Sequence, residues 1–424
     1  MAKLPNRTLY KLMIIGFFIV LGMDSCRKEE IYEYDGIGNA NSYLFSLMNQ
    51  YYLWYNYMPS VNPSLYRNPE KLMDALLYKT YDNWSFVAKK AEFDSYFSAG
   101  EATGYGFSAI ANDSNDLFIA YVIANSPFQQ NGVERGYKFL KIDNQSVDAN
   151  NINILLEDAP THFFELLKTN GDTLRFNASR KVLTVNSILY SKIIDTVSKK
   201  IAYMVLNTFI STTKDELDAK FEVYEMEGIT DLILDLRYNG GGEVAIARYL
   251  CSNLAPDITK GKVFCKYVFN EKNENMNTTD TFDIATHNLK LNRLVVITTS
   301  ATASASEMVI NCMYPYFSEV IIVGSTTHGK PVGMIPVEYG SYYFVPVMFR
   351  TYNASDEGDY FSGLTASIDA LDDFTKNFGD SNEASFKAAL NYIITNAKSG
   401  VLKTPMKSYI VKPNSGLMHE IDLY

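Results

Sequence analysis

The sequence predicts an α/β protein with a buried, mostly parallel sheet, preceded by a smaller β domain and a short helical region. Between residues 183 and 400, short apolar runs alternate with amphipathic segments of helical length, as in parallel sheets covered by helices on both faces. Between 101 and 182 the pattern changes to short alternating strands and glycine turns. Between 41 and 100, apolar residues recur with helical spacing.

Composition limits the possible classes of protein. A chain of 424 residues has room for two or three domains of about 100–200 residues each. Its hydrophobic content of 47% excludes a largely disordered protein. A formal net charge of −10 argues against nucleic acid as a partner, because nucleic-acid binding needs a basic surface.

Residues 1–25 have the pattern of a signal peptide. Basic residues flank the apolar run Leu12–Met23, which is too short to span a bilayer of about 30 Å. A buried core helix is the alternative. Cys26 follows the small residue Ser25, and this pair resembles the lipobox of bacterial lipoproteins, with Met23 and Asp24 as departures. The resemblance implies acylation of Cys26, hence an exported protein lipid-anchored to the cell envelope, at its periplasmic or outer surface.

The next segments are a polar tether over 26–40 and a helical domain over 41–100. Apolar residues from Leu44 to Tyr55 predict an amphipathic helix that Pro59 stops. Asn68 and Pro69 predict the cap and first residue of a second helix.

The 101–182 segment resembles a PDZ domain in two places. Gly104, Tyr105, Gly106 and Phe107 stand where that family has its carboxylate-binding loop, and the segment 132–145 matches its most recognisable stretch. The resemblance implies that these four residues bind a peptide's carboxyl end while a strand edge pairs with its backbone. An ordinary turn before a strand is the alternative.

The 183–400 segment predicts alternating strands and helices, and 401–424 a C-terminal tail. The expected strands are 201–206, 231–236, 293–299 and 320–324, and the expected helices are 214–226, 243–254 and 303–314. Two junctions, 235–242 and 300–308, place small residues at helix N-termini, where free N–H groups favour negative charge. No phosphate-binding motif is present, so an oxyanion site is favoured.

Ser304 has two interpretations. Together with Glu307 it forms a Ser-x-x-Glu capping box, which predicts a helix cap. It is also a candidate nucleophile, with Ser306 and Thr302 as competing hydroxyls. Lys330 lies 26 residues further along, beside Gly329 and just past a buried strand. A lysine in an apolar site loses its proton more easily, and Ser–Lys pairs are a known variant of the serine triad.

The order of these motifs resembles the carboxyl-terminal processing proteases, serine peptidases of family S41. The resemblance implies a crotonase/ClpP-like core in which Ser304 is the nucleophile and Lys330 the base. It places the oxyanion donors on the backbone of Ala305 and of the 240–242 turn, with Gly240 and Gly241 as the candidates. It further implies cleavage of polypeptide substrates after docking of their C-termini, with no cofactor and no metal.

Two positions depart from that family. Met334 stands where a Gln usually orients the lysine amine, and His328 stands where an aromatic residue is common. His328 is therefore an alternative base, although a residue two before the lysine on an extended segment points elsewhere. Asp235 and Arg237 are expected to brace the glycine turn.

The remaining cysteines and histidines show no ligand spacing. Cys251, Cys265 and Cys312 contain no Cys-x-x-Cys pair, so neither a disulfide framework nor a zinc site is predicted, and a core location is expected. The other histidines are expected at the surface; they are residues 162, 287 and 419.

Two rival functions remain open at this point. One is a non-catalytic lipoprotein that binds protein tails through its PDZ-like domain on a decayed protease scaffold, which Met334 favours. The other is a crotonase-like acyl-thioester enzyme, since that fold shares oxyanion-type glycine turns. The oligomeric state has no signal in the sequence.

Overall fold

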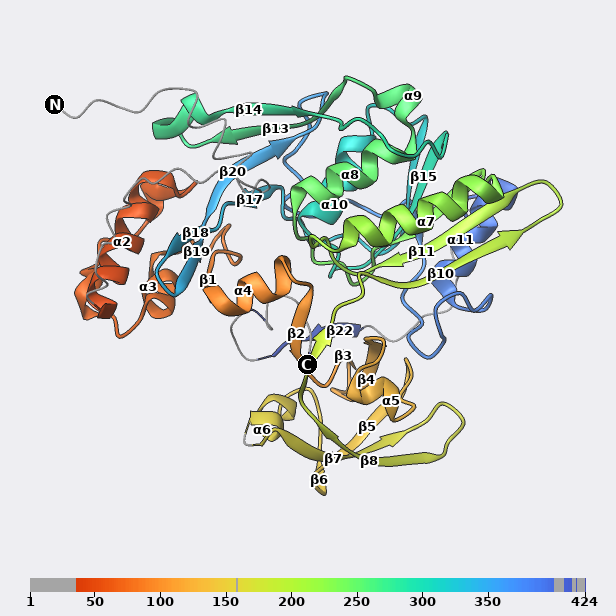
Figure 1. The fold of residues 1–424 in the computed structure, drawn as a ribbon, viewed down its shortest axis with the longest axis horizontal. Coiled ribbons are helices and arrows are strands. Elements are labelled where there is room, and N and C mark those ends of the chain that lie inside the picture. The colour runs from red at the N-terminus through yellow and green to blue at the C-terminus, as the bar shows by residue number, and fades with distance from the viewer. Residues whose placement is uncertain (1–35, 158, 400–407, 414–416, 418–423) are drawn as a thin grey trace, which may run out of the picture.

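The central sheet of the core has six strands, and five of them are parallel (Figure 1). The computed structural model describes residues 36–157, 159–399, 408–413, 417 and 424. The strand order is β10 (Ile188–Asp195), β11 (Lys200–Leu206), β12 (Asp231–Asp235), β15 (Arg293–Thr298), β16 (Glu319–Gly324) and β21 (Ile368–Asp369). The antiparallel strand β10 closes one edge. The predicted parallel sheet is confirmed.

Helices cover both faces of this sheet, because alternate strand residues point to opposite sides. Leu232 and Leu234 pack in one cluster with α7 (Thr213–Glu227), α8 (Val244–Leu254) and α10 (Ala305–Met313). Ile233 packs on the other face, in a cluster with α11 (Ala384–Thr395). The short helices of this region are α9 (Pro256–Thr259) and η3 (Glu271–Met276).

Two small antiparallel sheets, which the sequence did not predict, extend the core. One has the order β14 (Thr278–Thr281), β13 (Val263–Phe269), β20 (Val347–Tyr352) and β17 (Val332–Met334). The other has the order β1 (Phe86–Lys89), β19 (Tyr342–Val345) and β18 (Val337–Tyr339). Strand β1 belongs to the predicted helical region, so this region contributes a strand to a sheet of the core.

The front of the chain differs from its prediction at both ends of the first helix. Helix α2 (Gly36–Tyr51) begins inside the predicted tether and ends before Tyr55. Tyr55 lies in the 3₁₀ turn η1 (Tyr55–Tyr57), because three backbone bonds of 3₁₀ type replace the helical pattern there. The remaining helices are η2 (Pro63–Leu65), α3 (Pro69–Leu76) and α4 (Lys90–Phe97). The predicted cap is confirmed: Asn68 Oδ1 accepts from the Lys71 N–H at 3.0 Å.

This front region shares one hydrophobic core with the large sheet. Leu44, Met48 and Leu72 are fully or almost fully buried in the same cluster as Phe344 and Met348. The predicted boundary near residue 100 therefore does not separate two hydrophobic cores.

The 101–182 segment forms a separate β unit at the bottom of Figure 1. Strands β2 (Glu101–Gly104) and β9 (Lys181–Thr184) pair where the chain enters and leaves it. The sheet order is β22 (Ser408–Val411), β3 (Phe107–Asn112), β4 (Leu117–Val122), β5 (Lys138–Ile142), β7 (Thr161–Leu167) and β8 (Thr173–Ser179), with β6 (Gln145–Ser146) on β5. Its helices are α5 (Pro127–Gln130) and α6 (Ile152–Glu157). Its aromatic core includes Phe107, Phe128 and Phe164.

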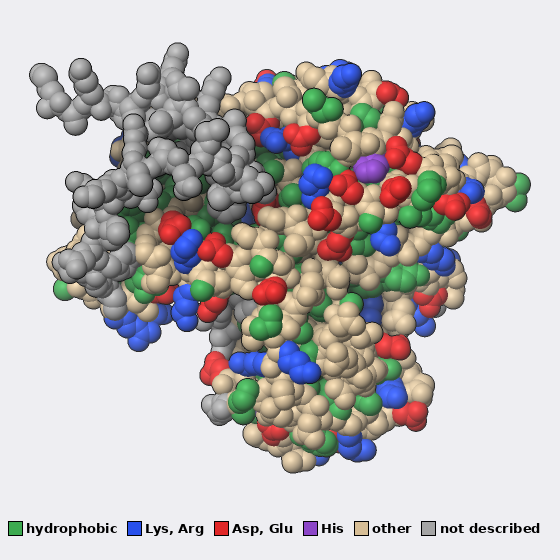
Figure 2. Space-filling view, viewed as in Figure 1, with side chains coloured by type: hydrophobic (Ala, Val, Ile, Leu, Met, Phe, Trp, Pro, Cys, Tyr) green, Lys and Arg blue, Asp and Glu red, His purple; other side chains and the backbone are tan. Residues whose placement is uncertain are grey.

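Within the described residues, no helix is long and apolar enough to cross a bilayer. Acidic and basic side chains are interspersed over the face shown in Figure 2. The predicted signal peptide and Cys26 lie outside the described residues.

Candidate active site

The two predicted junctions lie side by side at the carboxyl ends of β12 and β15. These strands are parallel neighbours, with Asp235 opposite Ile297, so the turns that follow them leave the same edge of the sheet. The Leu236 N–H donates to the Ile297 oxygen at 2.9 Å. The adjacency brings the glycine turn to the Ser304 loop.

Asn239 links the two junctions through its backbone and its side chain. Its backbone oxygen accepts from the Ala303 N–H at 3.1 Å and from Ser306 Oγ at 2.9 Å. Its side-chain oxygen accepts from the Gly241 N–H at 2.9 Å. The Gly241 N–H, a predicted oxyanion donor, is thus engaged within the turn, whereas Gly240 is exposed with open space beside its Cα.

The backbone of Ser304 does not have the conformation of an ordinary helix cap. Its φ is 57° and its ψ is −117°, whereas cap residues normally lie in the extended region. Positive φ in a residue other than glycine is strained, and such strain concentrates at functional sites. A Cβ on Gly241 would lie 2.9 Å from the Ser304 Cβ, so only glycine allows this close approach.

The two competing hydroxyls are buried and have structural partners. Thr302 Oγ1 donates to the Leu236 oxygen at 2.8 Å, and Ser306 Oγ donates to Asn239. Both residues are 0% exposed, whereas Ser304 is half-buried. Of the three hydroxyls, the accessible one is that of Ser304.

Glu307 joins the Ser304 loop to the Lys330 loop. Its buried carboxylate accepts from the backbone N–H groups of Ser304 (3.0 Å), Gly329 (2.6 Å) and Lys330 (2.8 Å), and from Thr327 Oγ1 (2.6 Å). Burial raises the pKa of Glu307, and these four donors oppose that shift. The capping-box pattern indicated only the bond to Ser304; the bonds to the second loop have no local signal in the sequence.

Lys330 is buried beside two side chains, one from its own loop and one from the front region of the chain. It is 9% exposed, and its Nζ lies 3.9 Å from Met334 Sδ and 5.8 Å from the centre of the Trp84 ring. The sequence identified Met334 as the departure at this position but gave no indication of Trp84. Trp84 comes from the front region, which thus forms part of the site.

Both ring nitrogens of His328 have partners. Nε2 lies 3.0 Å from Trp84 Nε1, which donates, and Nδ1 lies 3.2 Å from the Ser300 oxygen. Burial lowers the pKa of His328, and its hydrogen bond to the Ser300 oxygen offsets only part of that shift. A neutral ring with Nδ1 protonated satisfies both contacts, and this arrangement weakens the alternative that His328 is the base.

Arg237 lies behind the glycine turn, fully buried among carboxylates. Its guanidinium donates to Asp235 (2.7 Å), Asp372 (2.7 Å) and Glu383 (3.0 Å). Asp372 also accepts from Arg135 of the β unit at 2.5 Å. These ion pairs give Asp235 and Arg237 a structural role, and the network also joins the β unit to the core.

The predicted peptide-binding loop is occupied by the chain itself. The N–H groups of Tyr105, Gly106 and Phe107 converge on the backbone oxygen of Tyr424 at 3.0, 2.8 and 3.3 Å. A Cβ on Gly104 would lie 2.7 Å from the backbone carbon of Tyr424.

The expectation that the other histidines lie at the surface is wrong for His162. This residue is 3% exposed, and its Nδ1 lies 2.5 Å from Asp143; two polar partners make its burial possible. His287 is half-buried beside Glu225, and residue 419 lies outside the described residues. Cys251, Cys265 and Cys312 are buried and free, as expected.

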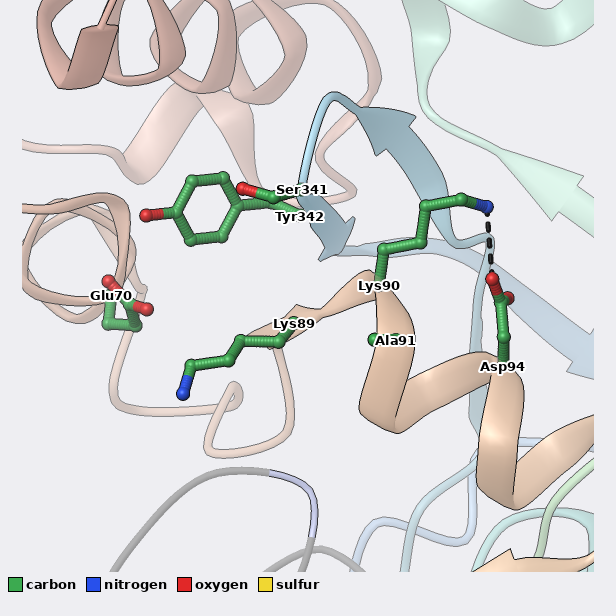
Figure 3. A pocket seen from close by; sticks show the side chains of 7 residues that line it. All are labelled: Glu70, Lys89, Lys90, Ala91, Asp94, Ser341 and Tyr342. Atoms are coloured by element: carbon green, nitrogen blue, oxygen red, sulfur yellow. Dashed lines mark ion pairs between the residues drawn. The ribbon is translucent and has the colours of Figure 1, made fainter.

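The described part of the chain contains no group of three or more potential metal ligands. The hollow in Figure 3 is lined by Glu70, Lys89, Lys90, Ala91, Asp94, Ser341 and Tyr342. An ion pair of 3.0 Å between Lys90 and Asp94 lies at its edge (Figure 3). None of the predicted site residues lines this hollow.

Two family models match this chain. The model of peptidase family S41 matches residues 200–369, which include both junctions and Lys330, and the model of the peptidase S41 N-terminal domain matches residues 39–86. The chain belongs to peptidase family S41. The second match ends at Phe86 and includes Trp84, so the front region of the site lies within a recognised S41 segment.

Curated S41 relatives share about a quarter of their aligned residues with the chain. The carboxy-terminal processing protease CtpA of Bacillus subtilis is 24% identical over 72% of this chain and 66% of its own length. The carboxyl-terminal-processing protease of Picosynechococcus is 25% identical over 55% of each chain. The chain thus spans about half to two-thirds of the length of these relatives.

A solved structure from Bacteroides fragilis, assigned to the S41 proteases, has the same fold. It superposes with a TM-score of 0.68 at 24% identity, over 88% of this chain and 100% of that one. The mixed α/β fold with an N-terminal region is therefore an S41 fold.

Proposed function

We propose that this chain is a serine endopeptidase of the carboxyl-terminal processing type, with Ser304 as nucleophile and Lys330 as base. The observation that carries the proposal is the Glu307 clamp, which holds the strained, accessible Ser304 and the Lys330 loop on one carboxylate. A helix cap alone needs neither the positive φ nor a second loop.

The reaction follows from these positions. Ser304 Oγ attacks the scissile carbonyl carbon while its proton passes to the neutral amine of Lys330. The Ala305 N–H, at the first turn of α10, and the Gly240 N–H donate hydrogen bonds to the negatively charged oxygen of the tetrahedral intermediate. The C–N bond then breaks, the leaving amine takes the proton from Lys330, and water releases the acyl group from Ser304.

The β unit is proposed as a PDZ-like docking module, and the core as crotonase/ClpP-like. The convergent amides of Tyr105, Gly106 and Phe107 suit a terminal carboxylate, and the adjacent edge of β3, where β22 of the chain's own tail pairs, is able to accept an added strand. Substrate tails then dock on the β unit, and the polypeptide continues to Ser304.

The decisive experiment measures cleavage of an unfolded protein such as reduced casein by the wild type and by Ser304→Ala, Lys330→Ala and Ser306→Ala. The first two are expected to lose at least about 1,000-fold in kcat. Ser306→Ala removes a structural hydrogen bond and is expected to keep measurable activity. Cleavage by Ser304→Ala at the wild-type rate would refute the dyad; no cleavage by the wild type would favour the tail-binding lipoprotein.

Export and lipid anchoring are proposed from the N-terminal pattern. If Cys26 is acylated, cells that express the chain incorporate labelled palmitate into it, and Cys26→Ser abolishes the incorporation. Incorporation that persists in Cys26→Ser would contradict the anchor.

A further inference from the structure

The backbone of Tyr424 is held in the loop as the end of a peptide ligand would be. Besides the three amides that point at its oxygen, its own N–H donates to the Phe107 oxygen at 2.8 Å. A terminal carboxylate adds a second oxygen and a full negative charge where three N–H dipoles already converge. The absence of a side chain at Gly104 leaves the space for this group.

The side chain of Tyr424 is also buried in the β unit and makes both an aromatic contact and a hydrogen bond there. The residue is 7% exposed, and its ring stacks on Phe107 with a centroid distance of 5.1 Å and an interplanar angle of 6°. Its hydroxyl donates to Asn153 Oδ1, on α6, at 3.0 Å. An apolar slot with one polar acceptor at its far end fits a terminal tyrosine.

Other described residues of the C-terminal tail also contact the β unit and the core. Strand β22 pairs antiparallel with the edge of β3, with Val411 opposite Ala109. The Asn153 side chain also donates to the Lys412 oxygen at 2.9 Å. Leu417, 3% exposed, packs in a cluster that includes Tyr238 of the core.

We propose that the groove between β3 and α6 binds polypeptides that end in an aromatic residue, and that Tyr424 is its resident ligand. The tail competes with substrate tails for the docking site, so the site is open only when Tyr424 leaves it. The competition rests on the proposed docking function, whereas the binding preference is independent of the Ser304 chemistry.

The test uses a fluorescent peptide with the sequence of residues 419–424 and a free carboxylate, bound to the Ser304→Ala protein with and without Tyr424→Ala. Removal of the resident ring is expected to tighten binding at least tenfold. In the Tyr424→Ala protein, the same peptide with an amidated end or with alanine in place of tyrosine should bind at least tenfold more weakly. Equal affinity for both proteins, or no preference among the peptides, would overturn the proposal.

Two further variants, both in the Tyr424→Ala protein, probe the slot itself. Gly104→Ala is expected to abolish peptide binding, because its Cβ would lie only 2.7 Å from the backbone carbon of the residue in the Tyr424 position. Asn153→Ala should equalise the affinities of peptides that end in Tyr and Phe, because the hydroxyl loses its acceptor. Unchanged binding in Gly104→Ala, or a retained Tyr preference in Asn153→Ala, would contradict the assigned slot.

Casein cleavage by the same proteins with Ser304 restored separates the two proposals. Cleavage without any peptide preference refutes the binding inference alone, and peptide binding without cleavage refutes the peptidase proposal alone.

Discussion

Glu307 is the residue on which the geometry of the site depends most directly. One carboxylate oxygen accepts from Thr327 Oγ1 and from the Gly329 N–H. The other accepts from the N–H groups of Ser304 and Lys330. In Glu307→Gln, an NH₂ group replaces one oxygen and faces backbone donors. We expect kcat to fall by about 10- to 100-fold, because small misplacements of reacting groups are costly.

The measurement for Glu307→Gln is steady-state kinetics together with circular dichroism. If Glu307 has a positioning role, the variant has a lower kcat, a KM close to that of the wild type and the circular dichroism spectrum of a folded protein. A kcat within twofold of the wild type would contradict that role.

Gly241 and Gly240 form a matched pair for testing the close approach to Ser304. A Cβ on Gly241 meets the Ser304 Cβ at 2.9 Å, and its φ is 111°, whereas a Cβ on Gly240 meets nothing within 4 Å. We expect Gly241→Ala to abolish casein cleavage and Gly240→Ala to cause a much smaller loss. Equal losses in the two variants would show that the approach of Gly241 is not what matters.

At the scale of elements, the start of α8 carries a titratable group. Glu243 precedes this helix, directly after the glycine turn, and burial raises its pKa to about 7, although Ser211 donates to it at 2.9 Å. Between pH 4.5 and about 7, the Glu243 carboxyl of the folded protein keeps its proton, whereas that of the unfolded chain has released it. The contribution to stability is therefore full below pH 4.5 and is lost as the pH rises through 7.

Thermal unfolding at pH 5 and pH 8 tests this titration. The Tm of the wild type is expected to fall between the two values by more than that of Glu243→Gln, whose amide carries no charge. An exposed carboxylate, that of Asp74, provides the control Asp74→Asn, which should leave the wild-type difference intact. Identical pH dependence in wild type and Glu243→Gln would refute the assignment.

At the scale of the whole molecule, Asp372 connects the two main units. It accepts from Arg135 of the β unit and from Arg237 of the core, and the three side chains are almost fully buried. Breaking such a pair leaves buried charges uncompensated, so Asp372→Asn is expected to cost about 3–5 kcal/mol. The exposed pair of Lys79 and Asp74 should contribute less than about 1 kcal/mol.

Urea unfolding of Asp372→Asn and Asp74→Asn measures this difference. The variants should differ in midpoint with similar slopes if the network stabilises a single cooperative fold. A loss below about 1 kcal/mol in Asp372→Asn would mean that the network contributes no more than an exposed pair.

The sequence by itself determined the central parallel strands and main helices of the core and the segments that carry the site. Apolar runs such as 231–236 are local patterns, and parallel strands then necessarily bring their following turns to one edge. Asn68, Pro69 and the three core cysteines were likewise placed by local chemistry. The irregular end of α2 at Tyr51 was not, because its side chains pack against distant strands.

Only the tertiary structure decided what surrounds the two candidate catalytic residues. Trp84 contacts His328, 244 residues further along the chain, and Arg135 contacts Asp372, 237 residues further along. No periodic pattern in the sequence indicates either contact. Tyr424 fills the loop of Gly104 to Phe107 for the same reason. Periodicity encodes secondary structure along the chain, whereas these contacts form only when burial of apolar surface brings distant segments together.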